Sequence, residues 1–147
     1  MLLTKAYAAP DATSPVGPFE IQRREPGPDD VLFEILYCGV CHTDIHMTRA
    51  ESGSGIFPMV PGHEIVGKVV RTGDNVARFK QGEIVAVGCM VDSCRTCSEC
   101  ESGNEHFCDQ MVTTYNCYEK DGKTPTYGGY STQLTVDQNY LLKVLKI

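Results

Sequence analysis

The feature that most constrains this chain is a run of closely spaced cysteines. Four of the eight cysteines form the pattern Cys94-x2-Cys97-x2-Cys100-x7-Cys108. Cysteines three residues apart are poorly placed to form a disulfide with each other, but their thiolates can converge on one centre from successive turns of a loop. Four thiolates in a tetrahedron form the closed, structural kind of Zn²⁺ site. The spacing therefore predicts a structural zinc lobe over residues 92–112, in preference to redox-active or merely buried thiols.

The other four cysteines carry a different signal. An even total of eight would suit four disulfides in a small secreted protein, but the spacing argues against that interpretation. Cys38, Cys89 and Cys117 stand alone among apolar or turn residues and are best interpreted as small buried hydrophobes. Cys41 is the exception, because the residues that follow it, His42 to His46, include side chains that can bind metals or transfer protons.

Composition excludes several classes of protein. With 13 basic against 19 acidic side chains, the net charge of −6 leaves no basic patch for a nucleic acid. No apolar run approaches the ~20 residues of a membrane span, and the first residues lack the apolar core of an export signal. We therefore expect a cytoplasmic, single-domain protein of 147 residues, and its 14 glycines and 8 prolines favour a turn-rich β structure.

The pattern of apolar residues predicts short strands separated by turns. One strand, over 31–37, reads as buried on both faces, and another, over 130–136, alternates as a half-buried strand. Thr43 or Asp44 could cap a short helix that follows Cys41. Further strands are expected at 65–71, 83–87 and 140–147. The arrangement favours a mainly β fold, a partly open β-barrel with one or two short helices. No Gly-x-Gly-x-x-Gly turn follows a strand, so we expect no dinucleotide-binding domain in this chain.

A second candidate cluster joins Cys41 to His63 and Glu64. Because 22 residues separate the cysteine from the histidine, spacing alone cannot bring them together. A lone histidine in the turn Val60-Pro61-Gly62-His63 is more often structural than ligating. The adjacent carboxylate and the remote thiol strengthen the interpretation as a metal site, and both interpretations stay open.

Several segments together resemble the zinc-dependent medium-chain alcohol dehydrogenases, within the branch of cinnamyl alcohol dehydrogenases and bacterial aldehyde reductases. The similarity covers nearly the whole chain in the right order. It implies a GroES-like catalytic domain over 1–147, with the Rossmann coenzyme domain absent from this chain. The matching segments are 38–46 (CGVCHTDIH), 60–67 (VPGHEIVG), 88–94 (GCMVDSC), 114–116 (TYN) and 128–131 (GGYS).

The resemblance assigns a catalytic Zn²⁺ to Cys41 and His63. Glu64 would be an alternate ligand that moves on and off the metal, although a carboxylate that only supports the ligands is an equally open interpretation. A third thiolate ligand is implied from a segment beyond this chain, because none of the remaining cysteines aligns with it. The isolated chain is therefore expected to lack dehydrogenase turnover.

The resemblance also implies a path for the substrate proton. Thr43 would take the proton of the alcohol, and His46 would pass it to water after it crosses the cofactor ribose. Asp44 would orient His63 by accepting its free ring N–H, a role compatible with capping the helix. His42 would join Thr43 and His46 in binding NADP, although the residues alone suggest structural or surface roles for His42 and His106.

The function implied is the interconversion of primary alcohols and aldehydes by an NADP-preferring zinc enzyme. The partners expected are a small alcohol or aldehyde, with no nucleic acid and no membrane. The alternative is a stand-alone zinc-binding scaffold that self-associates through the exposed interdomain surface, or a minimal zinc site at Cys41, His63 and Glu64 with weak hydrolytic activity.

Overall fold

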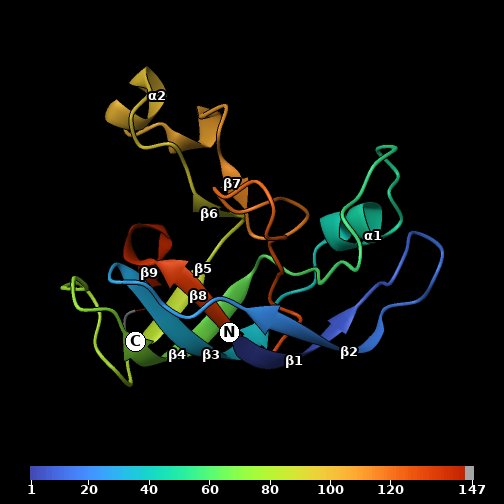
Figure 1. Cartoon of the computed structure of the whole chain (residues 1–147), viewed down its shortest axis with the longest axis horizontal. Coiled ribbons are helices and arrows are strands. Elements are labelled where there is room, and N and C mark those ends of the chain that lie inside the picture. The colour runs from blue at the N-terminus through green and yellow to red at the C-terminus, as the bar shows by residue number, and fades with distance from the viewer. Residues whose placement is uncertain (145–147) are drawn as a thin grey trace.

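The computed structural model describes residues 1–144, and its centre is one antiparallel sheet (Figure 1). Neighbouring strands in this sheet are all antiparallel. The sheets of the described chain do not close into a full barrel, so the predicted, partly open β architecture is confirmed. In spatial order the five strands are β8 (Gln133–Asp137), β3 (Asp30–Cys38), β4 (Ile65–Thr72), β5 (Ile84–Val87) and β9 (Leu142–Lys143).

The N-terminal residues form a separate hairpin beside this sheet. Strand β1 (Leu2–Ala8) pairs with β2 (Gly17–Arg23) along its whole length. Pro18 lies near the start of β2, on a strand with a single partner, where a missing N–H is tolerated. A bridge between Ala6 and Ser131 attaches the hairpin to the segment that leads into β8.

The cysteine run forms a lobe that extends away from the sheet (Figure 1). The lobe begins after β6 (Met90–Asp92) and returns through β7 (Val112–Thr113), which pairs with β6. Between these strands lie only the short helix α2 (Ser98–Glu101) and a 3₁₀ turn, η1 (Glu105–Phe107). Short helix α1 (His42–Thr48) lies on the other side of the molecule in this view.

Strand β3 differs from its prediction in the second half. Val31 and Phe33 are fully buried in the main core, so the first half is enclosed as expected. Leu36 and Tyr37, however, are 47% and 73% exposed. Strand β8 pairs with β3 only as far as Glu34, so the end of β3 lacks this cover.

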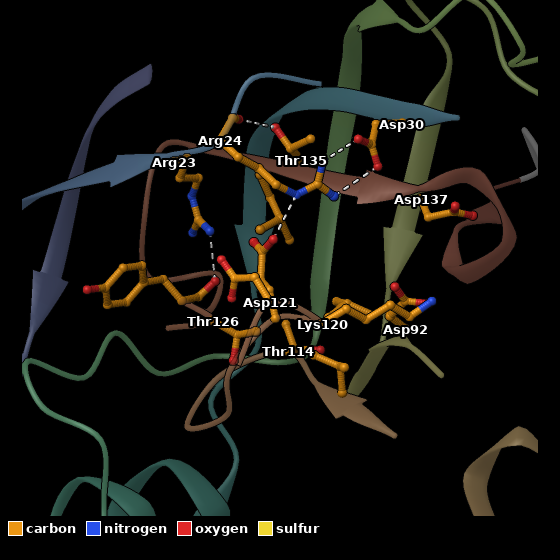
Figure 2. A pocket seen from close by; sticks show the side chains of 15 residues that line it. Arg23, Arg24, Asp30, Asp92, Thr114, Lys120, Asp121, Thr126, Thr135 and Asp137 are labelled. Atoms are coloured by element: carbon orange, nitrogen blue, oxygen red, sulfur yellow. Dashed lines mark hydrogen bonds and ion pairs between the residues drawn. The ribbon is translucent and has the colours of Figure 1, made fainter. Parts of the chain in front are cut away.

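Strand β8 is more buried than its alternating pattern predicts. Leu134 and Val136 face the apolar core, as the alternation requires. Thr135 and Asp137 are also buried. They line a polar cavity of about 320 Å³, and the ion-paired side chains around this cavity cover their face of the strand (Figure 2). There Arg24 pairs with Asp30 and Glu119, from two distant segments. Tertiary packing, rather than the strand's own pattern, buries this second face.

The C-terminal strand is shorter than expected. Of the predicted strand 140–147, Tyr140 ends a 3₁₀ turn, η2 (Gln138–Tyr140), and only Leu142–Lys143 pairs with β5. Residues 145–147 of that prediction lie outside the described residues. No described helix is both long and apolar enough to cross a membrane.

The three isolated cysteines differ in burial. Cys38 is half-buried and packs against the main core, which agrees with its interpretation as a small apolar residue. Cys117 is only half-buried, and Cys89 is exposed, so the prediction of a buried thiol is wrong at Cys89. It lines a surface groove together with Met90, where the chain leaves β5 for the lobe.

The contrast along β3 yields a stability prediction. Replacing Phe33, which is 0% exposed, by alanine leaves a cavity and should lower the free energy of unfolding by about 3–5 kcal/mol. The matched variant Tyr37→Ala, at a 73% exposed position of the same strand, should change it by less than about 0.5 kcal/mol. Urea denaturation of the two variants measures both values. Equal losses would contradict the burial described here.

Candidate functional site

The pairing of β3 with β4 explains how Cys41 and His63 meet. Cys38 at the end of β3 faces Ile65 at the start of β4. One residue further, the Gly39 N–H donates to the Glu64 carbonyl at 2.8 Å. The end of β3 and the start of β4 therefore lie side by side. Cys41, just after β3, and His63, just before β4, are brought close together in this way.

The first cluster consists of Cys41, His63 and Glu64. One potential ligand atom from each lies within 4.8 Å of the other two, so the structure brings together all three residues of the second predicted site. Gly39 makes room for this approach, because a Cβ at that position would overlap the Glu64 carboxylate. A thiol, an imidazole and a carboxylate are the three ligand types that Zn²⁺ takes in proteins.

The Cys41 thiol is prepared for the thiolate form. The Thr43 hydroxyl lies 3.4 Å from Cys41 Sγ, within hydrogen-bonding distance of the sulfur. This hydrogen bond, together with the Thr43 backbone and the His63 ring, lowers the pKa of Cys41 below its ordinary value. Since the thiolate is the form that ligates metals, the surroundings of Cys41 favour metal binding.

Asp44 is buried, and its hydrogen bonds differ from the prediction. It does not cap α1 as the first residue, because Cys41 occupies the N-cap position. Asp44 Oδ2 instead accepts the Cys41 N–H at 3.0 Å, and Oδ1 accepts the Gly62 N–H at 2.9 Å. The hydrogen bond expected from His63 to Asp44 is not formed within residues 1–144. The carboxylate thus holds the backbone at Cys41 and at Gly62, next to His63. Sequence spacing does not reveal these two hydrogen bonds.

The two histidines of α1 lie on its exposed face. His42 and His46 are exposed, and their rings meet edge to face at 4.4 Å. Nδ1 of His46 also pairs with the Glu51 carboxylate. Thr43 lies half-buried, between this exposed face and the cluster. Glu51 was not foreseen, because five residues separate it from His46 and no helical spacing joins them.

The second cluster contains the four lobe cysteines. The sulfurs of Cys94, Cys97, Cys100 and Cys108 all lie within 4.8 Å of one another, so the structure brings together the whole predicted set. The backbone N–H groups of Thr96 and Cys97 donate to Cys94 Sγ and lower its pKa to about 6. Backbone donors to a thiolate are the kind of outer interaction that orients and tunes metal ligands.

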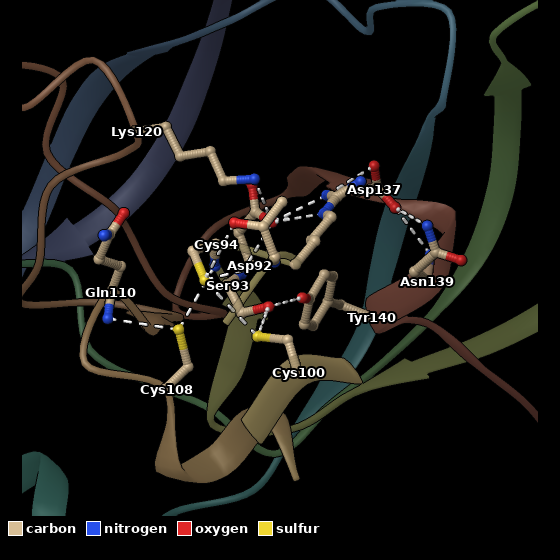
Figure 3. A network of polar contacts seen from close by, with 12 residues as sticks. Asp92, Ser93, Cys94, Cys100, Cys108, Gln110, Lys120, Asp137, Asn139 and Tyr140 are labelled. Atoms are coloured by element: carbon tan, nitrogen blue, oxygen red, sulfur yellow. Dashed lines mark hydrogen bonds and ion pairs between the residues drawn. The ribbon is translucent and has the colours of Figure 1, made fainter. Parts of the chain in front are cut away.

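A polar network ties this lobe to the rest of the molecule (Figure 3). The Tyr140 hydroxyl donates to Ser93 Oγ at 2.6 Å, and Ser93 Oγ lies 3.2 Å from Cys100 Sγ. Ser93 is completely buried. Sequence reasoning missed this pair, because Ser93 and Tyr140 are 47 residues apart and neither is a metal ligand type.

Further unforeseen neighbours of the first cluster come from the segment after β7. The Tyr115 ring lies 5.6 Å from the His63 ring, centroid to centroid. Asn116 next to it accepts the Ile56 N–H at 2.9 Å and donates to Met47 Sδ at 3.2 Å, which fixes the segment against α1. His106 packs on Phe107 in the lobe and joins neither cluster of the described chain.

Comparison with known proteins agrees with this fold. The model of the alcohol dehydrogenase GroES-like domain matches residues 27–146. Aldehyde reductase YahK of Escherichia coli (strain K12) is 51% identical over 140 residues, which cover 95% of this chain and 40% of that protein. Probable cinnamyl alcohol dehydrogenase 3 of Oryza sativa subsp. japonica is 50% identical over 135 residues, 92% of this chain and 37% of that protein.

Solved structures give the same result. The crystal structure of CAD from Helicobacter pylori complexed with NADP(H) superposes with a TM-score of 0.94 at 42% identity, covering 97% of this chain and 42% of that one. Cinnamyl alcohol dehydrogenase SbCAD4 from Sorghum bicolor gives 0.95 at 39% identity, with coverages of 99% and 41%. This chain thus spans about two fifths of the length of these relatives. It belongs to the family of alcohol dehydrogenase GroES-like domains.

Proposed function

We propose that this chain is the catalytic domain of a zinc-dependent, NADP-preferring alcohol dehydrogenase or aldehyde reductase that interconverts primary alcohols and aldehydes. The observation that carries the proposal is the convergence of Cys41, His63 and Glu64 at one end of the β3–β4 ladder. Relatives named for aldehyde reduction and for NADP-dependent alcohol oxidation support it.

The first cluster fits a catalytic zinc ion. Cys41 and His63 would be lasting ligands, and the exposed Glu64 would be the ligand that exchanges. A bound Zn²⁺ supplies a Lewis acid that lowers the pKa of an alcohol or polarises an aldehyde carbonyl. The four lobe cysteines fit a second, structural zinc ion, since a closed set of thiolates leaves no position for substrate.

Residues of α1 would transfer the proton of the substrate hydroxyl to water. The Thr43 hydroxyl, beside Cys41, is placed to accept the proton of the substrate hydroxyl. His46 lies exposed on the next turn, where it would exchange that proton with water. The exposed ring of His42 would contribute to NADP binding together with Thr43 and His46.

NADP comes to this proposal from the relatives. The Helicobacter pylori structure contains NADP(H), and a relative from Mycolicibacterium smegmatis (strain ATCC 700084 / mc(2)155), 49% identical, is named an NADP-dependent alcohol dehydrogenase. The described strands all pair antiparallel, so they contain no βαβ nucleotide-binding unit. We infer that turnover requires a coenzyme domain in addition to residues 1–147.

An alternative is a zinc-binding scaffold that self-associates. The specific observation in its favour is an open apolar groove of about 890 Å³ between the N-terminal hairpin and the end of β3. Tyr7, Leu36 and Tyr37, which line this groove, are between 47% and 73% exposed. Such a surface would suit a second copy of the chain.

Metal content tests both zinc sites directly. Elemental analysis of the purified chain should give about two zinc ions, and Cys41→Ser should give about one, because the four lobe thiolates are untouched. A serine at the exposed Cys89 should leave the value at about two. One zinc in the unsubstituted chain would mean that Cys41, His63 and Glu64 do not retain zinc without a further protein ligand.

Removing the structural metal should loosen the lobe. Zinc binding to small thiolate sites contributes roughly 10–16 kcal/mol at neutral pH, so chelation or Cys97→Ser should lower the melting temperature of the chain. Hydrogen exchange should rise mainly over 94–108. The Cys89→Ser variant, treated in the same way, is the control. An unchanged melting curve after chelation would rule out a structural metal.

A domain exchange tests the catalytic function. We expect a chimera in which this chain replaces the matching segment of aldehyde reductase YahK to reduce benzaldehyde with NADPH, whereas the isolated chain should not. In the chimera Cys41→Ala should abolish turnover, and Thr43→Val should lower it by about 10²–10⁴-fold. Cys89→Ala should retain turnover.

Two results would count against this function. One is turnover of benzaldehyde by the isolated chain, free of any longer enzyme. The other is ester hydrolysis by that chain that disappears with Cys41→Ala, since this would favour a minimal hydrolytic site.

A further inference from the structure

A buried carboxylate holds both ligand segments of the first cluster. Asp44 is 4% exposed, and its two oxygens accept the N–H groups of Cys41 and Gly62, the residue before His63. The Tyr130 hydroxyl donates a third hydrogen bond to Oδ2, at 3.3 Å. The position of the thiol relative to the imidazole therefore depends on how firmly Asp44 is held.

The acceptor capacity of this carboxylate is not filled. An ionised carboxylate offers about four acceptor positions, and three are used by donors among the described residues. Tyr115 supplies a matching donor. Its side chain is 5% exposed, and its hydroxyl is buried without a hydrogen-bond partner in the described chain. Burial and the adjacent Asp44 carboxylate raise the pKa of Tyr115, so the hydroxyl keeps its proton.

The two tyrosines reach Asp44 from different segments of the chain. Tyr115 follows β7, and its carbonyl accepts the Thr113 hydroxyl at 2.8 Å. Tyr130 is held by its N–H, which donates to the Pro61 carbonyl at 3.0 Å. Gly62 permits the close packing of Tyr130, because a Cβ there would lie 2.7 Å from the ring, and its φ of +101° suits glycine.

We propose that Tyr115 and Tyr130 are positioning residues of the first metal site, which donate together to Asp44 and so fix Cys41 and His63 in their ligating arrangement. This inference rests on the proposed function of that site. When the metal is bound, the Tyr115 hydroxyl takes the last acceptor position of Asp44. In this role neither tyrosine is a metal ligand. The rival donor for that position is the His63 ring, as the resemblance implies.

Cobalt binding tests the proposal without any measurement of activity. The chain is first loaded with one equivalent of Zn²⁺ to fill the four-thiolate lobe, and Co²⁺ is then titrated into the remaining site. The thiolate-to-cobalt absorption band reports the Cys41 site, and its loss in Cys41→Ser verifies that assignment. The variants are Tyr115→Phe and Tyr130→Phe, each of which removes one oxygen, and Tyr37→Phe is the control at an exposed position.

We expect Tyr115→Phe to weaken Co²⁺ binding about 10-fold and to shift the band, as loss of an outer hydrogen bond does at other metal sites. Tyr130→Phe should act in the same direction, and Tyr37→Phe should match the unsubstituted chain. In an Asp44→Asn background, Tyr115→Phe should add little, because both changes act through one carboxylate. Circular dichroism of each variant checks that the fold is retained.

Two outcomes would overturn the inference, and they are distinguishable. If the unsubstituted chain gives a Cys41-dependent band and Tyr115→Phe leaves its position and affinity unchanged, the role of Tyr115 is wrong. If the unsubstituted chain gives no such band, Cys41, His63 and Glu64 do not hold a metal by themselves, and the positioning role proposed for this chain fails with them.

Discussion

The register of β3 against β4 is the constraint on which the geometry of the first cluster depends. Because Cys38 faces Ile65, the residues just after β3 and just before β4 meet at one end of the ladder. A slip by one residue would turn every side chain of β3 to the opposite face and separate Cys41 from His63. The apolar core formed by Val31, Phe33 and Val69 fixes this register, so the stability of the sheet and the geometry of the site share one cause.

The two cysteine-containing sites differ in how much of them can be predicted from sequence. The four lobe cysteines lie within 15 residues, so their spacing alone indicates a common centre, and the structure does bring their sulfurs together. Cys41 and His63 meet only through strand pairing, and spacing left a structural role for His63 open. Resemblance to known enzymes, rather than residue pattern, identified that pair.

Apolar periodicity predicts the strands correctly where neighbouring strands of the same sheet decide their burial, as in β4 and β5. Prediction failed where distant segments decide burial. Tyr37 is exposed because β8 stops pairing with β3 at Glu34, and Thr135 is buried because ion-paired side chains from distant segments cover its face of β8. Similarly, the hydrogen bonds of Asp44 join backbone groups that adjoin one another only in three dimensions. No local pattern encodes such contacts.

The first cluster is asymmetric, and this asymmetry bears on its chemistry. On its buried side, Asp44 holds the backbone beside both ligands. On its open side, Glu64 and His46 are exposed to solvent. A ligand that exchanges and a group that releases protons both need access to water, whereas lasting ligands need a fixed frame. The division between buried and exposed residues therefore matches the division of roles that we propose for this site, with Thr43 between the two sides.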